Sequence, residues 1–351
     1  MNEAQKNQRR PSFFHHLHPP TIPAQQARFR YTLGMGGLSV FMLLVLLVTG
    51  ALEMYFYVPT PEQASPSIQM ITFLVPFGAL IRNMHFWSAQ LLVATASLHL
   101  LRVIFTGSYA PPRRFNYLLG MSLYVLVLLL DFSGYILRWD EGVRWALVAG
   151  TNLIKSIPVI GSSLYLFIMG GQRPGTATLL RFYSWHLFGL TLTLVLLIVW
   201  HIFRVRRDGG IAVPPPELRS DQVRISRFEL ARREALAALL SLCLLLLISN
   251  FMPAPLAPGM TKVTSQVSDA RAPWFFLWVQ ELLRFGNAFW MGVAVPLGIL
   301  SLLVLLPYVT PNPAPEELGR WFPRSSRPAQ VIAAVLVLIL LGITMKALFL
   351  P

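Results

Sequence analysis

The chain has 351 residues, of which 55% are hydrophobic and 13% are charged, and 29 Lys and Arg against 15 Asp and Glu give a formal charge of +14. Soluble domains carry about 25% charged residues, so this composition excludes an ordinary soluble domain and a disordered chain. Long apolar runs separated by short Arg-rich segments are typical of a protein with several membrane spans. The positive charge therefore requires no nucleic acid as a partner.

Seven apolar stretches are long enough to cross a bilayer, since a helix needs about 20 such residues for the hydrocarbon layer. Because lipid offers the backbone no hydrogen-bond partners, each stretch is expected to be a helix. The predicted fold is an all-α, polytopic membrane protein. The predicted spans are 32–57, 83–105, 116–138, 184–204, 231–251, 287–309 and 329–350.

Changes in composition divide the sequence into four predicted parts. A basic segment with three consecutive prolines at 214–216 is typical of a linker. Residues 139–183 contain tryptophans and apolar residues, which favours short helices lying along the membrane surface. The predicted parts are a tail at 1–31, a four-helix domain at 32–210, a linker at 211–230 and a three-helix domain at 231–351.

Positive charge is unevenly distributed between the two ends of the spans. Of the 29 Lys and Arg, 19 lie on the side of the N-terminal tail, so the positive-inside rule places this tail in the cytoplasm, most simply that of a bacterial cell. We call this the negative side and the opposite face the positive side. The tail has no apolar core, so no cleaved signal peptide is predicted. Its histidines His15, His16 and His18 are expected to be surface residues.

The other four histidines lie inside predicted spans, His85 and His99 in the second and His186 and His201 in the fourth. An ionisable side chain in a span is costly and is a candidate for function. The spacings of 14 and 15 residues leave each pair on one helix face, with angular offsets of about 40° and about 60°. If the two helices face each other, His85 meets His186 near the positive side and His99 meets His201 near the negative side. Two such axial pairs can hold the irons of two non-covalent b-type haems.

Glycines on the first and third spans repeat the 14-residue spacing of the second, as Gly36 with Gly50 and Gly120 with Gly134. Glycine allows a flat ring to approach the backbone closely, although single glycines in spans also serve helix packing. Two pairs in register with the histidines favour a role in cofactor binding.

Arginines accompany the histidines. Arg82 lies three residues before His85 and Arg102 three residues after His99, so each shares a face with its histidine. Haem propionates need cationic partners, and we expect both arginines to bind them. Arg206 is a third candidate, for which extension of the side chain to the membrane surface is an equal alternative.

Together these residues resemble the cytochrome b subunit of quinol:cytochrome c oxidoreductases. The 15-residue histidine spacing and the Ile-Pro-Val-Ile-Gly segment at 157–161 resemble its b6-type branch, and residues 231–351 resemble subunit IV, here fused to the first part. The segments that carry the resemblance are Gly36 and Gly50, Arg82-Asn83-Met84-His85, His99-Leu100-Leu101-Arg102, Gly120 and Gly134, 157–161, and Arg181-Phe182-Tyr183-Ser184-Trp185-His186.

The resemblance implies that the chain carries electrons through two haems, between quinol oxidation on the positive side and quinone reduction on the negative side, and so contributes to a proton-motive force. It also implies partners: a Rieske-type iron-sulfur protein, a cytochrome c-type subunit, the quinone pool, lipids and a second copy of the complex.

The sequence departs from the family in the loop that oxidises quinol. The family commonly has Pro-Glu-Trp-Tyr there, and its glutamate is taken to accept a quinol proton. Here the matching segment is Ala-Pro-Trp-Phe at 272–275, and proline cannot accept a proton, so another base is needed. Trp274 and Phe275 are expected to form a wall of the pocket. The candidate bases are Asp140, Glu141 and Glu281.

A second departure concerns a further haem. The b6-type proteins carry a cysteine at the negative-side start of the first span, which holds a covalent c-type haem. Alignment on Gly50 places Gly34 at that position, and the one cysteine, Cys243, lies in the fifth span. No covalently attached haem is therefore predicted on this chain.

Three alternatives to a quinol-oxidising subunit share some of these sequence features. A two-haem membrane anchor would pass electrons between quinone and another partner without sending the two electrons to different acceptors. A haem-free transporter would use the histidines as a proton relay, but it would normally show broken helices or an internal repeat. An NADPH-driven reductase would need flavin and nicotinamide domains, and no dinucleotide-binding glycine fingerprint occurs.

Overall fold

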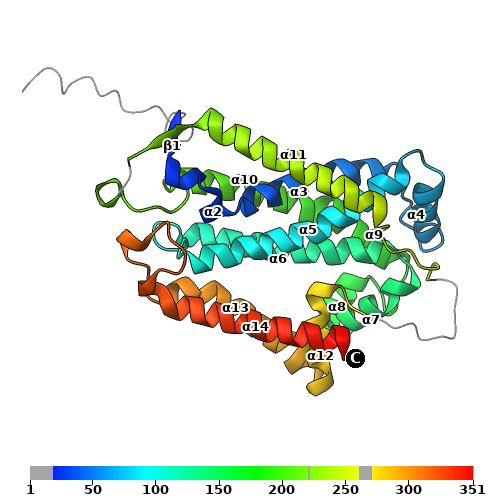
Figure 1. The fold of residues 1–351 in the computed structure, drawn as a ribbon. Coiled ribbons are helices and arrows are strands. Elements are labelled where there is room, and N and C mark those ends of the chain that lie inside the picture. The colour runs from blue at the N-terminus through cyan, green and yellow to red at the C-terminus, as the bar shows by residue number, and fades with distance from the viewer. Residues whose placement is uncertain (1–18, 220–221, 261–270, 351) are drawn as a thin grey trace, which may run out of the picture.

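The computed structural model describes residues 19–219, 222–260 and 271–350, so the tail histidines lie outside the described residues. Within this part of the chain, seven helical segments are long and apolar enough to cross a membrane, and they lie side by side in one elongated bundle (Figure 1). The all-α, polytopic fold is confirmed. The spans are α3 (Met35–Met54), α5 (Gly78–Phe105), α6 (Arg114–Leu137), the run of α9 (Thr176–Ser184), η3 (Trp185–Leu190) and α10 (Thr191–Arg207), α11 (Arg227–Phe251), η7 (Trp290–Ala294) with α13 (Val295–Val309), and α14 (Arg327–Phe349).

The second span begins five residues earlier than expected, because the chain turns sharply out of the short helix α4 (Ala64–Phe73). Phe77 takes a left-handed conformation with φ of 59° at this turn. Gly78 follows it, and a Cβ there would lie 1.9 Å from the carbonyl oxygen of Ile71. The turn therefore requires glycine, and α5 starts directly after it.

The connection between the third and fourth spans is helical, as predicted. It forms α7 (Glu141–Lys155) and α8 (Gly161–Met169), which lie together at one end of the bundle (Figure 1). Leu147 of α7, Met169 of α8 and Leu179 of α9 are fully buried in one apolar cluster with the end of α6. This end, which carries His85 and His186, is the predicted positive side.

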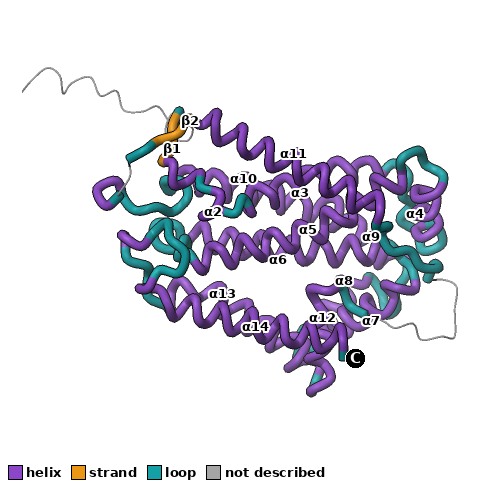
Figure 2. Tube along the Cα trace, in the orientation of Figure 1, coloured by secondary structure: helices purple, strands orange, loops and turns teal. Residues whose placement is uncertain are grey.

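The opposite end contains a feature that the sequence did not predict, a two-stranded antiparallel ribbon of β1 (Thr21–Pro23) and β2 (Arg224–Ser226), drawn in orange in Figure 2. The ribbon joins the start of the described chain to the predicted linker. Gln26 also donates hydrogen bonds to the carbonyl oxygens of Gly209 and Ile211, each at 3.0 Å. Hydrogen bonds thus hold residues 21–26 against both ends of the predicted linker at one end of the bundle.

The last three spans lie on two different edges of the first four. Helix α11 packs along α3 and α5, whereas α13 packs against α6 and α14 against α5 (Figure 1). The hydroxyl of Tyr117 in α6 donates to the carbonyl oxygen of Leu303 in α13 at 2.7 Å. The short helix α12 (Leu277–Leu282) packs on α14 near the C-terminal end.

Candidate functional site

Four spans form the site as two pairs, α3 with α5, and α6 with the run of η3 and α10. In each pair one helix carries glycines and the other carries histidines. A Cβ built on Gly36 would lie 3.1 Å from Cε1 of His99, and one built on Gly50 would lie 3.0 Å from Cε1 of His85. Each glycine thus makes room for an imidazole of the neighbouring helix.

The second pair repeats this arrangement. A Cβ on Gly120 would lie 3.4 Å from Cε1 of His201, and one on Gly134 only 2.7 Å from Cε1 of His186. The sequence predicted that these glycines would receive a flat ring. The ring that lies directly on each of them is an imidazole, so the glycines set how closely the histidine helices approach.

His85 and His186 face each other across the bundle with their ring centres 6.5 Å apart and their planes inclined by 66°. A metal bond to an imidazole nitrogen is about 2 Å long, and the nitrogen lies roughly 1 Å from the ring centre, so two imidazoles on opposite sides of one metal ion have centres about 6 Å apart. The residues therefore fit a bis-imidazole iron site. Near the other end, the imidazoles of His99 and His201 lie on Gly36 and Gly120, respectively.

Hydroxyl groups orient the two positive-side imidazoles. Thr49 Oγ1 lies 2.9 Å from Nδ1 of His85 and donates to the carbonyl oxygen of Val45. Ser133 Oγ lies 3.0 Å from Nδ1 of His186 and donates to the carbonyl oxygen of Leu130. Because each hydroxyl proton is used on the backbone, each oxygen accepts from the imidazole N–H. This leaves Nε2 of both rings free for a metal.

These hydroxyls were not identified from the sequence, although a signal was present. Thr49 and Ser133 each precede a site glycine, giving Thr-Gly and Ser-Gly at the two positive-side positions. Met35 and Leu119 stand at the matching negative-side positions, so no hydroxyl residue precedes the site glycine there. The two histidine pairs therefore have different surroundings.

The fourth span contains a π segment, η3, that starts one residue before His186. A π turn holds one residue more than an α turn, so the 15-residue step from His186 to His201 advances the helix about as far as 14 residues do in a regular helix. The hydroxyl of Thr191 donates a hydrogen bond to the carbonyl oxygen of His186 in this segment. The π segment thus reduces the 60° offset expected from the sequence and brings both histidines onto one face.

The predicted propionate partners differ in their hydrogen bonding. Arg102 is buried, donates from Nε to the carbonyl oxygen of Tyr31 at 3.1 Å, and has a buried Nη2 without a partner. Arg82 is also buried and donates to the carbonyl oxygens of Ala254 and Pro255. The free donor of Arg102 fits a propionate, whereas Arg82 also ties α5 to the segment after α11. Arg206 lies near the C-terminal end of α10 and is partly exposed.

The predicted wall of the quinol pocket lies in the 3-10 turn η5 (Trp274–Phe276). Phe275 is buried between the helices in a cluster with Leu92 and Val127, whereas 45% of the Trp274 side chain is exposed. The ring of Phe276 packs edge-on against that of Phe132 with centres 6.0 Å apart. The loop segment thus reaches the positive-side part of α6, next to Ser133 and His186.

The three predicted bases are all near cations. Asp140 caps α7 by accepting a hydrogen bond from the backbone N–H of Val143, and its Oδ2 lies 2.6 Å from Nη2 of Arg138. Glu281 is buried, 2.8 Å from Lys346, and the hydrogen bond from Lys346 lowers the pKa of Glu281 below its usual value, with Arg284 adding to the effect.

Glu141 lies 3.6 Å from Arg144 and has one buried oxygen without a hydrogen bond. The structure does not bring the three acids together: Asp140 and Glu141 lie at the start of α7, whereas Glu281 lies in α12 against α14.

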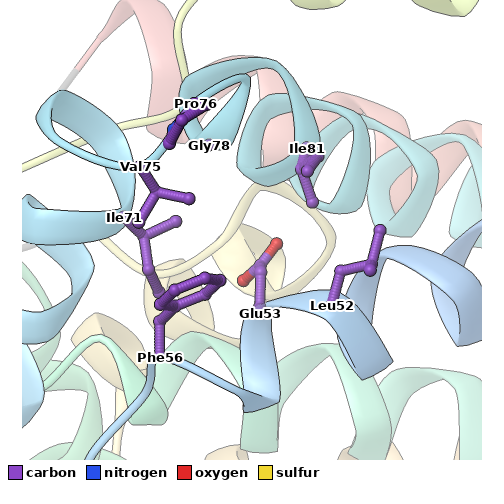
Figure 3. Close-up of a pocket in the computed structure, with 8 residues that line it drawn as sticks. All are labelled: Leu52, Glu53, Phe56, Ile71, Val75, Pro76, Gly78 and Ile81. Carbon is purple, nitrogen blue, oxygen red and sulfur yellow. The ribbon is translucent and has the colours of Figure 1, made fainter.

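A further carboxyl lies at the same end of the bundle, in a recess of about 250 Å³ between α3, α4 and α5. Figure 3 shows Glu53 directed into this recess between Phe56 and Ile81. One of its oxygens is buried without a hydrogen-bond partner. Glu53 was not identified from the sequence, where its signal is a lone acid within the apolar run from Ala51 to Val58.

Comparison with known proteins identifies the family. The family model described as "Cytochrome b/b6/petB" matches residues 23–209, more than half of the chain. The chain belongs to the cytochrome b/b6 family. As a member of this haem-binding, electron-transport family with seven candidate spans in its described residues, it is a multi-pass integral membrane protein and an electron-transfer subunit of an oxidoreductase.

Relatives in this family are similar over most of their own length. Cytochrome b6 of Heliobacterium mobile is 40% identical over 192 residues, which cover 55% of this chain and 88% of that protein. Cytochrome b6 of Synechococcus elongatus is 35% identical over 175 residues, or 50% of this chain and 81% of that one. This chain thus consists of a part similar to cytochrome b6 and an additional C-terminal part.

The fold likeness extends into that C-terminal part. A solved structure described as "Hyperthermophilic respiratory Complex III" superimposes with a TM-score of 0.75, covering 90% of this chain and 84% of its own, at 22% sequence identity. At this identity the likeness shows a shared fold.

Proposed function

We propose that this chain is the di-haem cytochrome b subunit of a quinol:electron-acceptor oxidoreductase. In this role it carries electrons across the membrane between quinol oxidation on the positive side and quinone reduction on the negative side. The proposal rests on one observation: His85 and His186 face each other with their ring centres 6.5 Å apart. The glycine beside each of the four span histidines supports it.

The donor set supports two non-covalent haems. His85 with His186 would hold one iron and His99 with His201 the other, and a six-coordinate bis-imidazole iron supplies one-electron transfer without an open position for oxygen. Arg102 would bind a propionate with its free Nη2. Cys243 is exposed on α11, and Gly34 precedes α3, which supports the prediction of no covalent c-type haem.

The orientation and partners follow from the same proposal. The N-terminal segment lies on the cytoplasmic side of a bacterial membrane, consistent with its excess of Lys and Arg. The partners are a Rieske-type iron-sulfur protein, a cytochrome c-type subunit, the quinone pool and lipids, with a second copy of the complex.

One spectrum tests the haem assignment. The purified full chain is expected to show a b-type reduced-minus-oxidised spectrum with two haems per chain, both released by acidic acetone. His186→Ala should lose the positive-side haem and His201→Ala the negative-side haem, whereas His16→Ala should retain both. A chain without haem would support a transporter, and haem that stays on the chain in a denaturing gel would contradict the non-covalent assignment.

A second candidate is a two-haem membrane anchor without electron bifurcation, and one observation favours it: Pro273 stands where the family commonly has glutamate. Purification in mild detergent distinguishes the two. Co-purification of a Rieske-type protein and a cytochrome c supports the first candidate, and co-purification of a different catalytic subunit supports the anchor.

A further inference from the structure

A hydrogen-bonded chain connects a carboxyl inside a span to the loop tryptophan. Asp131 lies on α6, three residues before Gly134, and its Oδ1 accepts a hydrogen bond from Nε2 of Gln90 on α5 at 3.2 Å. The other end of the same amide, Oε1 of Gln90, accepts from Nε1 of Trp274 at 2.9 Å. Gln90 therefore bridges Asp131 and the predicted wall of the pocket.

The two residues that follow Asp131 contact the rest of the positive-side site. Phe132 packs against Phe276 of the loop, and Ser133 holds the imidazole of His186. One turn of α6 thus touches the loop on one side and a candidate iron ligand on the other. A quinol that is oxidised beside this loop would lie within reach of the same turn.

The charge environment distinguishes Asp131 from the three bases predicted from the sequence. Asp140, Glu141 and Glu281 each lie within 4 Å of an arginine or lysine nitrogen, so each carboxylate already has a cationic partner. In the described part of the chain, Asp131 makes no ion pair, and its partner is a neutral amide. A carboxyl that is kept in a span without a counter-charge is a candidate for proton transfer.

We propose that Asp131 is the base that accepts a proton from quinol in the positive-side pocket, with Gln90 holding it in line with Trp274. In this step the O–H bond of a quinol hydroxyl breaks and an O–H bond forms on the carboxylate. The electron pair stays on the quinol oxygen, so the products are a quinolate and a neutral carboxylic acid. The inference rests on the proposed quinol oxidation and names its base.

The test uses membranes that contain the full chain with its native partners. Rapid mixing with menadiol, and in a parallel series with decylubiquinol, measures the rate of haem b reduction. Asp131→Asn keeps the size and the hydrogen bond to Gln90 but cannot accept the proton, so we expect a loss of about a hundredfold in rate. Haem content and the quinol concentration for half-maximal rate should stay unchanged, and Asp131→Glu should restore much of the rate.

Infrared difference spectra provide a readout that is independent of rate. A carboxylic C=O band should appear when quinol is oxidised by the wild-type chain and be absent in Asp131→Asn. Gln90→Leu keeps the carboxyl but breaks the bridge, so its band should remain with a shifted position. These spectra separate proton acceptance from a purely structural effect of the substitution.

Glu62→Gln is the matched control, because it removes an exposed carboxyl on the turn before α4, at the same end of the bundle and outside the proposed site. It should retain the wild-type rate within a factor of two. A wild-type rate in Asp131→Asn, or an equal loss in Glu62→Gln, would overturn the assignment to Asp131 and leave quinol oxidation intact. If neither quinol reduces the haem of the wild-type chain, the proposed function itself fails, and this inference with it.

Discussion

Each span histidine lies against a glycine, and the absence of a Cβ on that glycine provides the space for the imidazole. At Gly134 an added Cβ would lie 2.7 Å from the His186 imidazole, closer than real Cβ contacts, whereas at Gly120 the distance to His201 is 3.4 Å, an ordinary contact. Both positions belong to the same helix, and both partners belong to the same neighbouring span. They therefore form a matched pair for substitution.

We expect Gly134→Ala to displace His186 and to lower the haem content from two to about one per chain, since small errors in ligand placement are enough to weaken metal binding. Gly120→Ala should retain both haems. Pyridine haemochrome spectra with protein determination measure the ratio. Gly342→Ala, where nothing lies within 4 Å of the added Cβ, serves as the control for helix stability, and equal haem content in the two α6 variants would contradict the geometry.

The hydroxyls on the positive-side imidazoles should tune the redox potential of that site. A hydrogen bond from Nδ1–H to Ser133 makes the imidazole a stronger electron donor, which favours the oxidised metal. Ser133→Ala and Thr49→Val should therefore raise the midpoint potential of the positive-side haem. With a net hydrogen-bond contribution of about 1 kcal/mol, the rise is about 40 mV for one electron.

Potentiometric titration followed at the haem absorbance bands measures this rise. The negative-side potential should stay unchanged in both variants, because neither hydroxyl lies beside His99 or His201. A fall in the positive-side potential, or a shift confined to the negative side, would contradict the roles given to Thr49 and Ser133.

At the scale of elements, the contact of α12 with α14 depends on an ion pair that responds to pH. Lys346 and Arg284 lower the pKa of Glu281 below its ordinary value of 4.5. A lowered folded-state pKa stabilises the fold at pH above the ordinary value, and the stabilisation is lost as the pH falls through the lowered value. The contact is therefore expected to be strong at neutral pH and weak in acid.

Thermal unfolding in detergent at pH 7 and at pH 4 or lower tests this ion pair. Glu281→Gln should lower the unfolding temperature at pH 7, and its difference from the wild-type chain should shrink in acid. Glu316→Gln, an exposed acid on the loop before α14, should follow the wild-type chain at both values. If the difference in unfolding temperature between Glu281→Gln and the wild-type chain grows in acid, the ion pair does not stabilise the fold at neutral pH as expected.

Most elements and the histidine pairs could be predicted from the sequence, because apolar length and helical spacing are local properties. The π segment η3 could not, since it arises from the hydrogen bonding of a few residues after Trp185 rather than from composition. The ribbon of β1 and β2 was missed for a related reason: each strand has three residues, and they are paired across some 200 positions of the chain. Asp131 was missed although it is a lone acid inside the predicted span 116–138, because its partner Gln90 lies on another helix and their contact is not a local property.

At the scale of the whole molecule, the ribbon and the bonds of Gln26 fix residues 21–26 and the segments 209–219 and 222–226 on one end of the bundle. Residues exposed there should be reached from one side of the membrane only. In a Cys243→Ser background, Glu217→Cys should react with a membrane-impermeant maleimide from the cytoplasmic side. Glu62→Cys, on the exposed turn before α4, should react from the opposite side, and labelling of both from one side would contradict the orientation.

The glycine contacts also have a consequence for assembly. Each pair is completed by its own glycine and imidazole contacts, α3 with α5, and α6 with the run of η3 and α10. Each proposed iron nevertheless takes one ligand from each pair. Neither pair alone can saturate a single metal ion. The prosthetic groups should therefore bind when one helix pair docks onto the other. A chain cut between α5 and α6 would bind haem only after its two fragments recombine.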